Sequence, residues 1–302
     1  MELFEKQIRS PLTGGGIKKI AEFYSTDIIK SYKIEYNIDV NLSFNGIEKV
    51  LLYRCENSGY EFYYPLEVAG KDDLYRQLAT FKWYYIPWKW EYEQSLIYAA
   101  RANSILEIGC GSGLFLENLK KRFPEKRISG LEITVNEMPE KFIINETIQE
   151  HVSHCNMQYD LVCSYQVLEH ISEVNSFLEA SIKALKSGGH LIISVPNNDG
   201  IFFKKRGEPL LNMPPHHMGL WNKKSLEYLT KLYPIQLVEK YYEPIQDYHY
   251  EWFKSIIKQK INQIQFPLLS RVINNQKVLS VIGQILRKFY NGHTFMFIYK
   301  KK

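Results

Sequence analysis

Cysteine is scarce in this sequence, and the four cysteines present are too far apart to suggest a disulfide framework or a zinc ribbon. Cys55, Cys110, Cys155 and Cys163 form no C-x-x-C pair, the spacing typical of zinc and redox motifs. Cys110 lies in a glycine-rich turn and Cys163 in an apolar run. We therefore expect reduced, buried thiols in a cytoplasmic protein.

Long apolar runs are also missing. No stretch reaches the roughly 20 apolar residues that span a bilayer, and the first residues lack the apolar run of a signal peptide. Internal repeats and low-complexity segments are absent as well. The 302 residues are 45% hydrophobic and 24% charged, a balance typical of globular proteins with one large domain or two small ones.

Acidic residues are few near the C-terminus. The segment 247–302 holds ten Lys or Arg against two acids, a balance of +8, so the rest of the chain carries −3 of the net +5. This segment also has apolar residues at helical spacing, a pattern that is compatible with peripheral contact with an anionic membrane. Nucleic acid is a less favoured partner because no recognised binding module is present. The favoured interpretation of the segment is a helical insert whose apolar face covers a sheet and whose lysines are solvated.

The most informative motif that is present is a glycine-rich turn after a short apolar run. Glycines stand at Gly109, Gly111 and Gly113, and the acid Glu107 precedes them. A dinucleotide fingerprint needs its third glycine at position 114, which is Leu114, so nicotinamide chemistry is disfavoured. A strand, this turn and a helix would bring backbone N–H groups close to a different nucleoside cofactor.

Strands and helices are expected to alternate over 104–245, which predicts a doubly wound, mostly parallel α/β sheet. We divide the chain into an α+β extension at 1–90, with an aromatic block at 81–92, and a main domain at 91–302 with a helical insert at about 246–291. The expected strands are 104–108, 128–132, 161–164, 190–195, 236–241 and 294–299. The expected helices are 114–122, 172–186 and 223–231. A small hairpin is predicted at 50–65.

Polar side chains follow two of the expected strands. Glu132 ends the second strand, 23 residues after Gly109, where a carboxylate can accept hydrogen bonds from a ribose diol. The expected strand 161–164 delivers Tyr165 and Gln166 to the same edge of the sheet. Ligands bind at this edge in such folds, so these side chains are predicted to line one cleft.

These elements, in this order and spacing, resemble class I S-adenosylmethionine-dependent methyltransferases over about residues 85–245 plus the last strand. The resemblance implies a seven-stranded sheet whose last strand is antiparallel to the others. It also implies S-adenosylmethionine as the cofactor, with its adenine bordered by the segment 145–151. The implied cofactor-binding residues are Glu107, Gly109, Gly111, Gly113, Glu132, Ile133, Tyr165 and Gln166.

Three histidines are the candidate catalytic bases, since a hydroxyl or amine acceptor must lose a proton. His170 follows the expected strand 161–164, and His216 and His217 lie in a loop after the expected strand 190–195. Their Pro-Pro-His-His segment resembles that of ubiquinone-biosynthesis-type O-methyltransferases, where this loop borders the acceptor pocket. The alternative is that these histidines only cap helices or hold the loop in place.

No metal is predicted. Some relatives hold a divalent ion with a Glu-x-x-Glu-His motif and a distant histidine, but here the first acid is replaced by Gln166, followed by Glu169 and His170. The segment around Cys55 resembles a degenerate zinc ribbon, yet a single cysteine leaves too few of the four ligands that zinc requires. We expect no zinc.

The acceptor is predicted to be a small molecule or a glycan, methylated on oxygen or nitrogen. The aromatic N-terminal zone resembles that of bacterial enzymes of surface-polysaccharide assembly. Methylation of RNA or protein is one alternative, and a cofactor-binding scaffold without turnover is another. The aromatic block at 81–92 would then form either a lid over the acceptor or a seam between domains.

Overall fold

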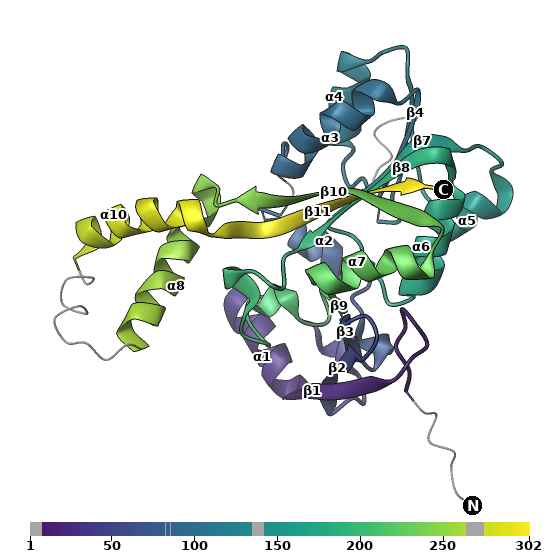
Figure 1. Cartoon of the computed structure of the whole chain (residues 1–302). Coiled ribbons are helices and arrows are strands. Elements are labelled where there is room, and N and C mark those ends of the chain that lie inside the picture. Colours follow the sequence, from purple (N-terminus) through teal and green to yellow (C-terminus); the bar gives the residue numbers. More distant parts are fainter. Residues whose placement is uncertain (1–7, 82, 85, 135–141, 264–274) are drawn as a thin grey trace, which may run out of the picture.

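A seven-stranded sheet forms the centre of the computed structural model, which describes residues 8–81, 83–84, 86–134, 142–263 and 275–302 (Figure 1). Its strand order is β10-β11-β8-β7-β4-β5-β6, and only β11 runs antiparallel to its neighbours. The strands are β4 (Ser104–Ile108), β5 (Arg127–Leu131), β6 (Ile143–Ile144), β7 (Tyr159–Tyr165), β8 (Leu185–Pro196), β10 (Ile235–Pro244) and β11 (Asn291–Lys301). The predicted fold class and the antiparallel last strand are confirmed.

Helices cover both faces of this sheet because successive strand residues point to opposite sides. The neighbouring β4 residues Ile105 and Leu106 belong to two different apolar clusters, one on each face of the sheet. Two helices cover the face of Ile105, and three cover the face of Leu106. The helices of the first face are α3 (Trp90–Arg101) and α4 (Leu114–Arg122). Those of the second are α5 (Ile148–His154), α6 (Val174–Lys183) and α7 (Lys223–Leu232). The sheet is therefore buried on both sides, as its near-continuous apolar strands require.

A second, antiparallel sheet lies beside the first and combines distant parts of the chain. Its order is β1-β2-β3-β9, and the β2–β3 pair is the predicted hairpin. The strands are β1 (Ile17–Tyr24), β2 (Lys49–Cys55), β3 (Glu61–Tyr64) and β9 (Gly219–Leu220). The accompanying helices are α1 (Ser25–Tyr36) and α2 (Asp72–Leu78), with short 3-10 turns at Asn41–Phe44, Leu66–Val68 and Leu210–Asn212. Strand β9 belongs to the loop after β8, so the N-terminal extension is completed by the loop that carries His216 and His217.

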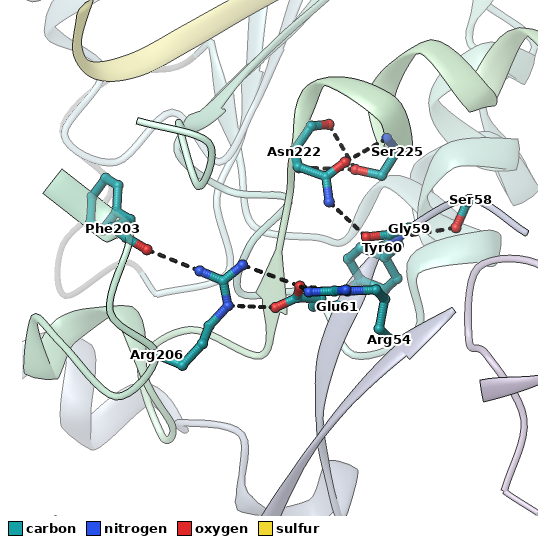
Figure 2. A network of polar contacts seen from close by, with 9 residues as sticks. All are labelled: Arg54, Ser58, Gly59, Tyr60, Glu61, Phe203, Arg206, Asn222 and Ser225. Carbon is teal, nitrogen blue, oxygen red and sulfur yellow. Dashed lines mark hydrogen bonds and ion pairs between the residues drawn. The ribbon is translucent and has the colours of Figure 1, made fainter. Parts of the chain in front are cut away.

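A buried carboxylate fastens that loop to the N-terminal sheet (Figure 2). Glu61 on β3 accepts hydrogen bonds from Arg54 on β2 at 2.7 Å and from Arg206 of the loop at 2.7 Å. At the other end of the loop, the side chain of Asn222 caps α7 and donates to the Gly59 carbonyl at 2.6 Å. Both ends of the loop are thus held by charge-assisted or capping bonds, which limits where its histidines can lie.

The C-terminal insert forms two helices between β10 and β11, α8 (Tyr250–Gln263) and α10 (Gln276–Leu286), flanked by 3-10 turns at Asp247–His249 and Arg287–Phe289. Figure 1 shows both helices projecting from the body at the end of the two strands. They pack on each other and on a 3-10 turn, Ile201–Phe203, around their own apolar cluster. The expectation that the insert covers the sheet is therefore wrong, because the sheet faces are already occupied by α3–α7. Within the described residues, no helix is both long and apolar enough to cross a membrane.

Candidate functional site

A cavity of about 720 Å³ opens at the carboxyl edge of the central sheet. Nine of the residues predicted for the site lie on its wall, namely Gly109, Gly111, Glu132, Ile133, Tyr165, Gln166, His170, His216 and His217. The other two, Glu107 and Gly113, do not line it. The structure therefore brings the predicted cofactor-binding and catalytic residues to one cavity, although they come from separate segments of the chain.

The turn after β4 depends on its glycines. Gly109, Gly111 and Gly113 have φ of 69°, 55° and 77°, in the left-handed region that disfavours side chains. A Cβ on Gly109 would also come within 2.4 Å of Val167 Cγ2. Gly113 is the N-cap residue of α4, so it contributes to the start of this helix and not to the cavity wall.

Glu107 lies behind this turn and is buried. Its Oε2 has no hydrogen-bond partner among the described residues, and burial raises the pKa of the carboxyl well above its usual range. An unpartnered buried acceptor is costly unless a donor or a proton reaches it. The role of Glu107 in cofactor binding stays a prediction.

Glu132 joins the glycine turn to the end of β5. Its Oε2 accepts from the Gly111 N–H at 2.7 Å and its Oε1 from the Thr134 N–H at 3.0 Å. The side-chain amide of Asn145 donates to the backbone carbonyl oxygens of Glu132 and Ile133 at 2.8 and 3.1 Å. The predicted ribose acceptor and the predicted adenine border are therefore held together, and the segment 146–149 joins them on the cavity wall.

Gln166 adopts a backbone conformation that is rare for its residue type, with φ of 57° directly after β7. Such strain costs of order 1–3 kcal/mol and is typical of functional sites. Its side-chain amide donates to Ser194 Oγ at 3.1 Å, which fixes it across the ends of β7 and β8. The adjacent Tyr165 is buried edge-on against Tyr92 and Phe115.

The three predicted histidines form one cluster, with ring centroids 4.5–4.8 Å apart. Each Nδ1 faces an oxygen that can only accept: the His216 carbonyl for His170 at 2.6 Å, and the Leu211 carbonyl for His216 at 2.9 Å. For His217 it is Oδ1 of Asn212, at 3.0 Å. Each Nδ1 must therefore donate, so the neutral rings carry their lone pair on Nε2.

Burial keeps these rings neutral. It lowers the pKa of His170 to about 4 and the pKa values of His216 and His217 well below the usual value. Neutral rings with a lone pair on Nε2 can accept hydrogen bonds but are weak bases. One nitrogen from each ring lies within 4.8 Å of one from the others, a spacing that would also suit a cation. The expectation of no metal stays a prediction.

Part of the aromatic block reaches the cavity. Trp83 and Tyr84 line it, and the Tyr84 hydroxyl lies 2.9 Å from His216 Nε2. Trp83 also stacks on Phe81 and contacts Tyr36 of α1. The described part of the block thus borders both the cavity and the N-terminal core, and both interpretations of it stay open.

Sequence reasoning missed the part of the wall next to the insert. Tyr248, Trp252 and His293 line the cavity there. One signal was available for His293, because it directly precedes the apolar run of an antiparallel last strand. Such a strand starts at the edge where the parallel strands end, so its first residues face the ligand edge.

Comparison with known proteins agrees with this geometry. Residues 91–239 match the family model described as a methyltransferase domain. Ubiquinone biosynthesis O-methyltransferases of Salmonella typhimurium and Salmonella typhi are 26% identical over 107 residues, which is 32% of this chain and 43% of theirs. The chain thus aligns with less than half the length of these curated relatives.

Solved structures with similar folds include a SAM-dependent methyltransferase from Archaeoglobus fulgidus, with a TM-score of 0.46, 17% identity and coverage of 77% of this chain and 95% of that one. Another is the plantazolicin methyltransferase BpumL in complex with SAH, with a TM-score of 0.47, 16% identity and coverage of 92% and 99%. Residues 91–239 therefore form a methyltransferase domain, and the motifs on the cavity wall are of the class I S-adenosylmethionine-dependent type.

Proposed function

We propose that this protein transfers a methyl group from S-adenosylmethionine to an oxygen or nitrogen of a small molecule or sugar. One observation carries the proposal: a single cavity is lined both by the glycine turn with Glu132 and by the three histidines. The first group would hold the nucleoside and methionine parts of the cofactor. The second would face the acceptor.

The chemistry needs mainly alignment, because the methyl carbon of a sulfonium is already activated. Holding donor and acceptor in line contributes up to about 7–11 kcal/mol in favourable cases. The neutral rings of His170 and His217 can accept hydrogen bonds from acceptor hydroxyl or amine groups and orient them, whereas Nε2 of His216 already faces the Tyr84 hydroxyl. Trp83 and Tyr84 would exclude water from the acceptor side.

Calorimetry and a transfer assay test this function directly. We expect S-adenosylmethionine and its demethylated product, S-adenosylhomocysteine, each to bind at one site, and NAD not to bind there, because position 114 lacks the glycine of a dinucleotide turn. Radioactive methyl transfer is then measured with catechol, methyl glucoside and glucosamine as acceptors. Binding of neither nucleoside would contradict the proposal, whereas binding without transfer to a broad acceptor panel would favour the scaffold.

A sugar acceptor, as in bacterial surface-polysaccharide assembly, is the form of this proposal that best suits the aromatic wall. Apolar faces of sugar rings pack well on aromatic side chains such as Trp83, Trp252 and Tyr248, which line the cavity. The same side chains would also accommodate an aromatic acceptor, so the transfer assay includes both kinds.

The insert supports a further part of the proposal, peripheral contact with an anionic membrane at the cytoplasmic face. Val281, Ile285 and Phe289 are 60%, 57% and 78% exposed and follow one another at helical spacing along α10 and the turn after it. Exposed cations, Lys277 and Lys288 among them, flank this stripe. Apolar side chains beside Lys residues are typical of helices that bind membrane surfaces.

Co-sedimentation with phosphatidylglycerol vesicles tests the membrane contact. We expect the double variant I285S/F289S to bind about tenfold less than the wild type, because burying apolar side chains contributes a large part of interfacial binding. Leu42→Ser is the matched control, since Leu42 is 90% exposed on the N-terminal extension. If the wild type stays in the supernatant at low salt, the membrane contact is wrong.

A further inference from the structure

We propose that His293, paired with the buried Glu243, is the base that takes the proton from the methyl acceptor. The proposal rests on the proposed methyl transfer and names a pair outside the three predicted histidines. The two residues come from the end of β10 and the start of β11, which are antiparallel neighbours. Both ends lie at the edge of the sheet where the cavity opens, and His293 is part of its wall.

Glu243 orients the ring of His293. The carboxyl is fully buried, and its Oε2 lies 2.9 Å from His293 Nδ1, while Tyr248 donates its hydroxyl to Oε1. Burial opposes ionisation of Glu243, but the hydrogen bonds from His293 and Tyr248 outweigh it and hold the pKa of the carboxyl below its usual value. Nδ1 of His293 also lies 2.8 Å from Thr294 Oγ1, which can donate or accept. The ionised carboxylate can only accept, so it requires the proton on Nδ1, and Nε2 carries the lone pair.

The partners of Glu243 are rings rather than permanent cations. Among the described residues, no Lys or Arg forms an ion pair with Glu243; its ion-pair partners are His293 and His249. The side chain of His293 is 37% exposed, so the ring has access to the cavity. A carboxylate behind a histidine is the arrangement that holds the base of many transferases and hydrolases in one tautomer.

His249 cannot take this role. Its Nδ1 accepts from the Gln246 N–H at 3.1 Å, so the proton of the neutral ring is on Nε2, 3.7 Å from Glu243 Oε2. Burial lowers the pKa of His249 to about 3, so the ring stays neutral. The nitrogens of Glu243's two histidine neighbours are close enough to suggest a metal site, but a protonated Nε2 has no lone pair to offer a metal.

The pair is linked to the cofactor edge. The Oγ1 atom of Thr294, the residue after His293, accepts a hydrogen bond from the side-chain amide of Gln166 at 3.4 Å. Gln166 is one of the predicted cofactor-binding residues. The base would therefore lie on the cavity wall next to the cofactor, and the three neutral histidines, which are weak bases, would orient the acceptor.

The step balances as a displacement with proton removal. The bond between the methyl carbon and sulfur breaks, and its electron pair stays on sulfur as the neutral thioether of S-adenosylhomocysteine. The carbon forms a bond to the acceptor oxygen or nitrogen, whose proton passes to His293 Nε2. The imidazolium is held beside the Glu243 carboxylate and then returns the proton to water.

Nitrogen NMR and kinetics of His293→Gln and Glu243→Gln test the pair. With S-adenosylhomocysteine bound at pH 8, the wild-type ring should show the Nδ1–H tautomer. General bases contribute on the order of 10²–10⁴-fold, so kcat of His293→Gln should fall at least about 100-fold with the KM for S-adenosylmethionine unchanged. Glu243→Gln should weaken the preference for the Nδ1–H tautomer, because a side-chain amide can donate to Nδ1 as well as accept from it.

The controls separate this inference from the methyl transfer itself. The control is His190→Gln, because His190 lies on β8 far from the carboxyl edge of the sheet and does not line the cavity. This variant should keep kcat within about twofold of the wild type. A wild type that transfers methyl groups while His293→Gln keeps its kcat would overturn the pair and leave the function standing. If no acceptor among catechol, methyl glucoside and glucosamine is methylated, an Nε2–H tautomer of His293 overturns the pair and an Nδ1–H tautomer supports it.

Discussion

Glu132→Ala should weaken the binding of S-adenosylmethionine and S-adenosylhomocysteine about 100-fold, because charge-assisted hydrogen bonds contribute about 1.5–3 kcal/mol. Glu132 stands on the cavity wall at the end of β5, beside the glycine turn. In the structure its two oxygens accept from Gly111 and Thr134. The carboxylate has further lone pairs, and the proposed role adds the two ribose hydroxyls to the donors it accepts from. Titration calorimetry of both nucleosides measures the loss.

A second ligand separates ribose binding from shaping of the turn. S-adenosylhomocysteine without its ribose 2′-hydroxyl should bind the wild type more weakly and bind Glu132→Ala with little further loss. Glu132→Gln keeps one acceptor oxygen and should fall between the two. An equal loss from the missing hydroxyl in wild type and variant would show that Glu132 acts only through the Gly111 N–H, and the ribose assignment would be wrong.

The centre of the fold was predictable because its signals are local. The strand β4, the turn with three glycines and the helix α4 follow one another within a short segment, and the observed helix has the predicted bounds. Near-continuous apolar strands required a sheet covered on both faces. The predicted site residues then followed, because the ends of parallel strands meet at one edge.

The other features of the fold and the site depend on contacts between residues far apart in the sequence, which local sequence patterns do not predict. Glu61 forms an ion pair with Arg206, which is 145 residues away in the sequence. This pair holds the loop that carries His216 and His217. The contact of Glu243 with His293 likewise spans 50 residues, across an insert of two helices. The orientation of that insert was mispredicted for the same reason. The spacing of its apolar residues predicts amphipathic helices, but it does not identify the surface against which these helices pack.

Trp221→Ala should lower the free energy of unfolding by about 3–5 kcal/mol, the range for deleting a large buried aromatic side chain. Trp221 is fully buried directly after β9, with its ring 4.4 Å from that of Tyr60. Its indole N–H donates to the Leu168 carbonyl at 3.4 Å. The side chain therefore fills the junction between the N-terminal sheet and the segment that leads to His170. Urea denaturation followed by circular dichroism measures the loss.

Trp83→Ala is the matched control, since Trp83 is 47% exposed and lies on the cavity wall. Its removal should change the free energy of unfolding by less than about 1 kcal/mol, as for most partly exposed positions. Trp221→Phe should recover part of the loss, because it keeps an aromatic ring against Tyr60 but removes the donor to Leu168. Equal destabilisation by Trp83→Ala and Trp221→Ala would mean that the junction does not hold the loop. The two sheets would then be coupled mainly through Glu61 and its arginines.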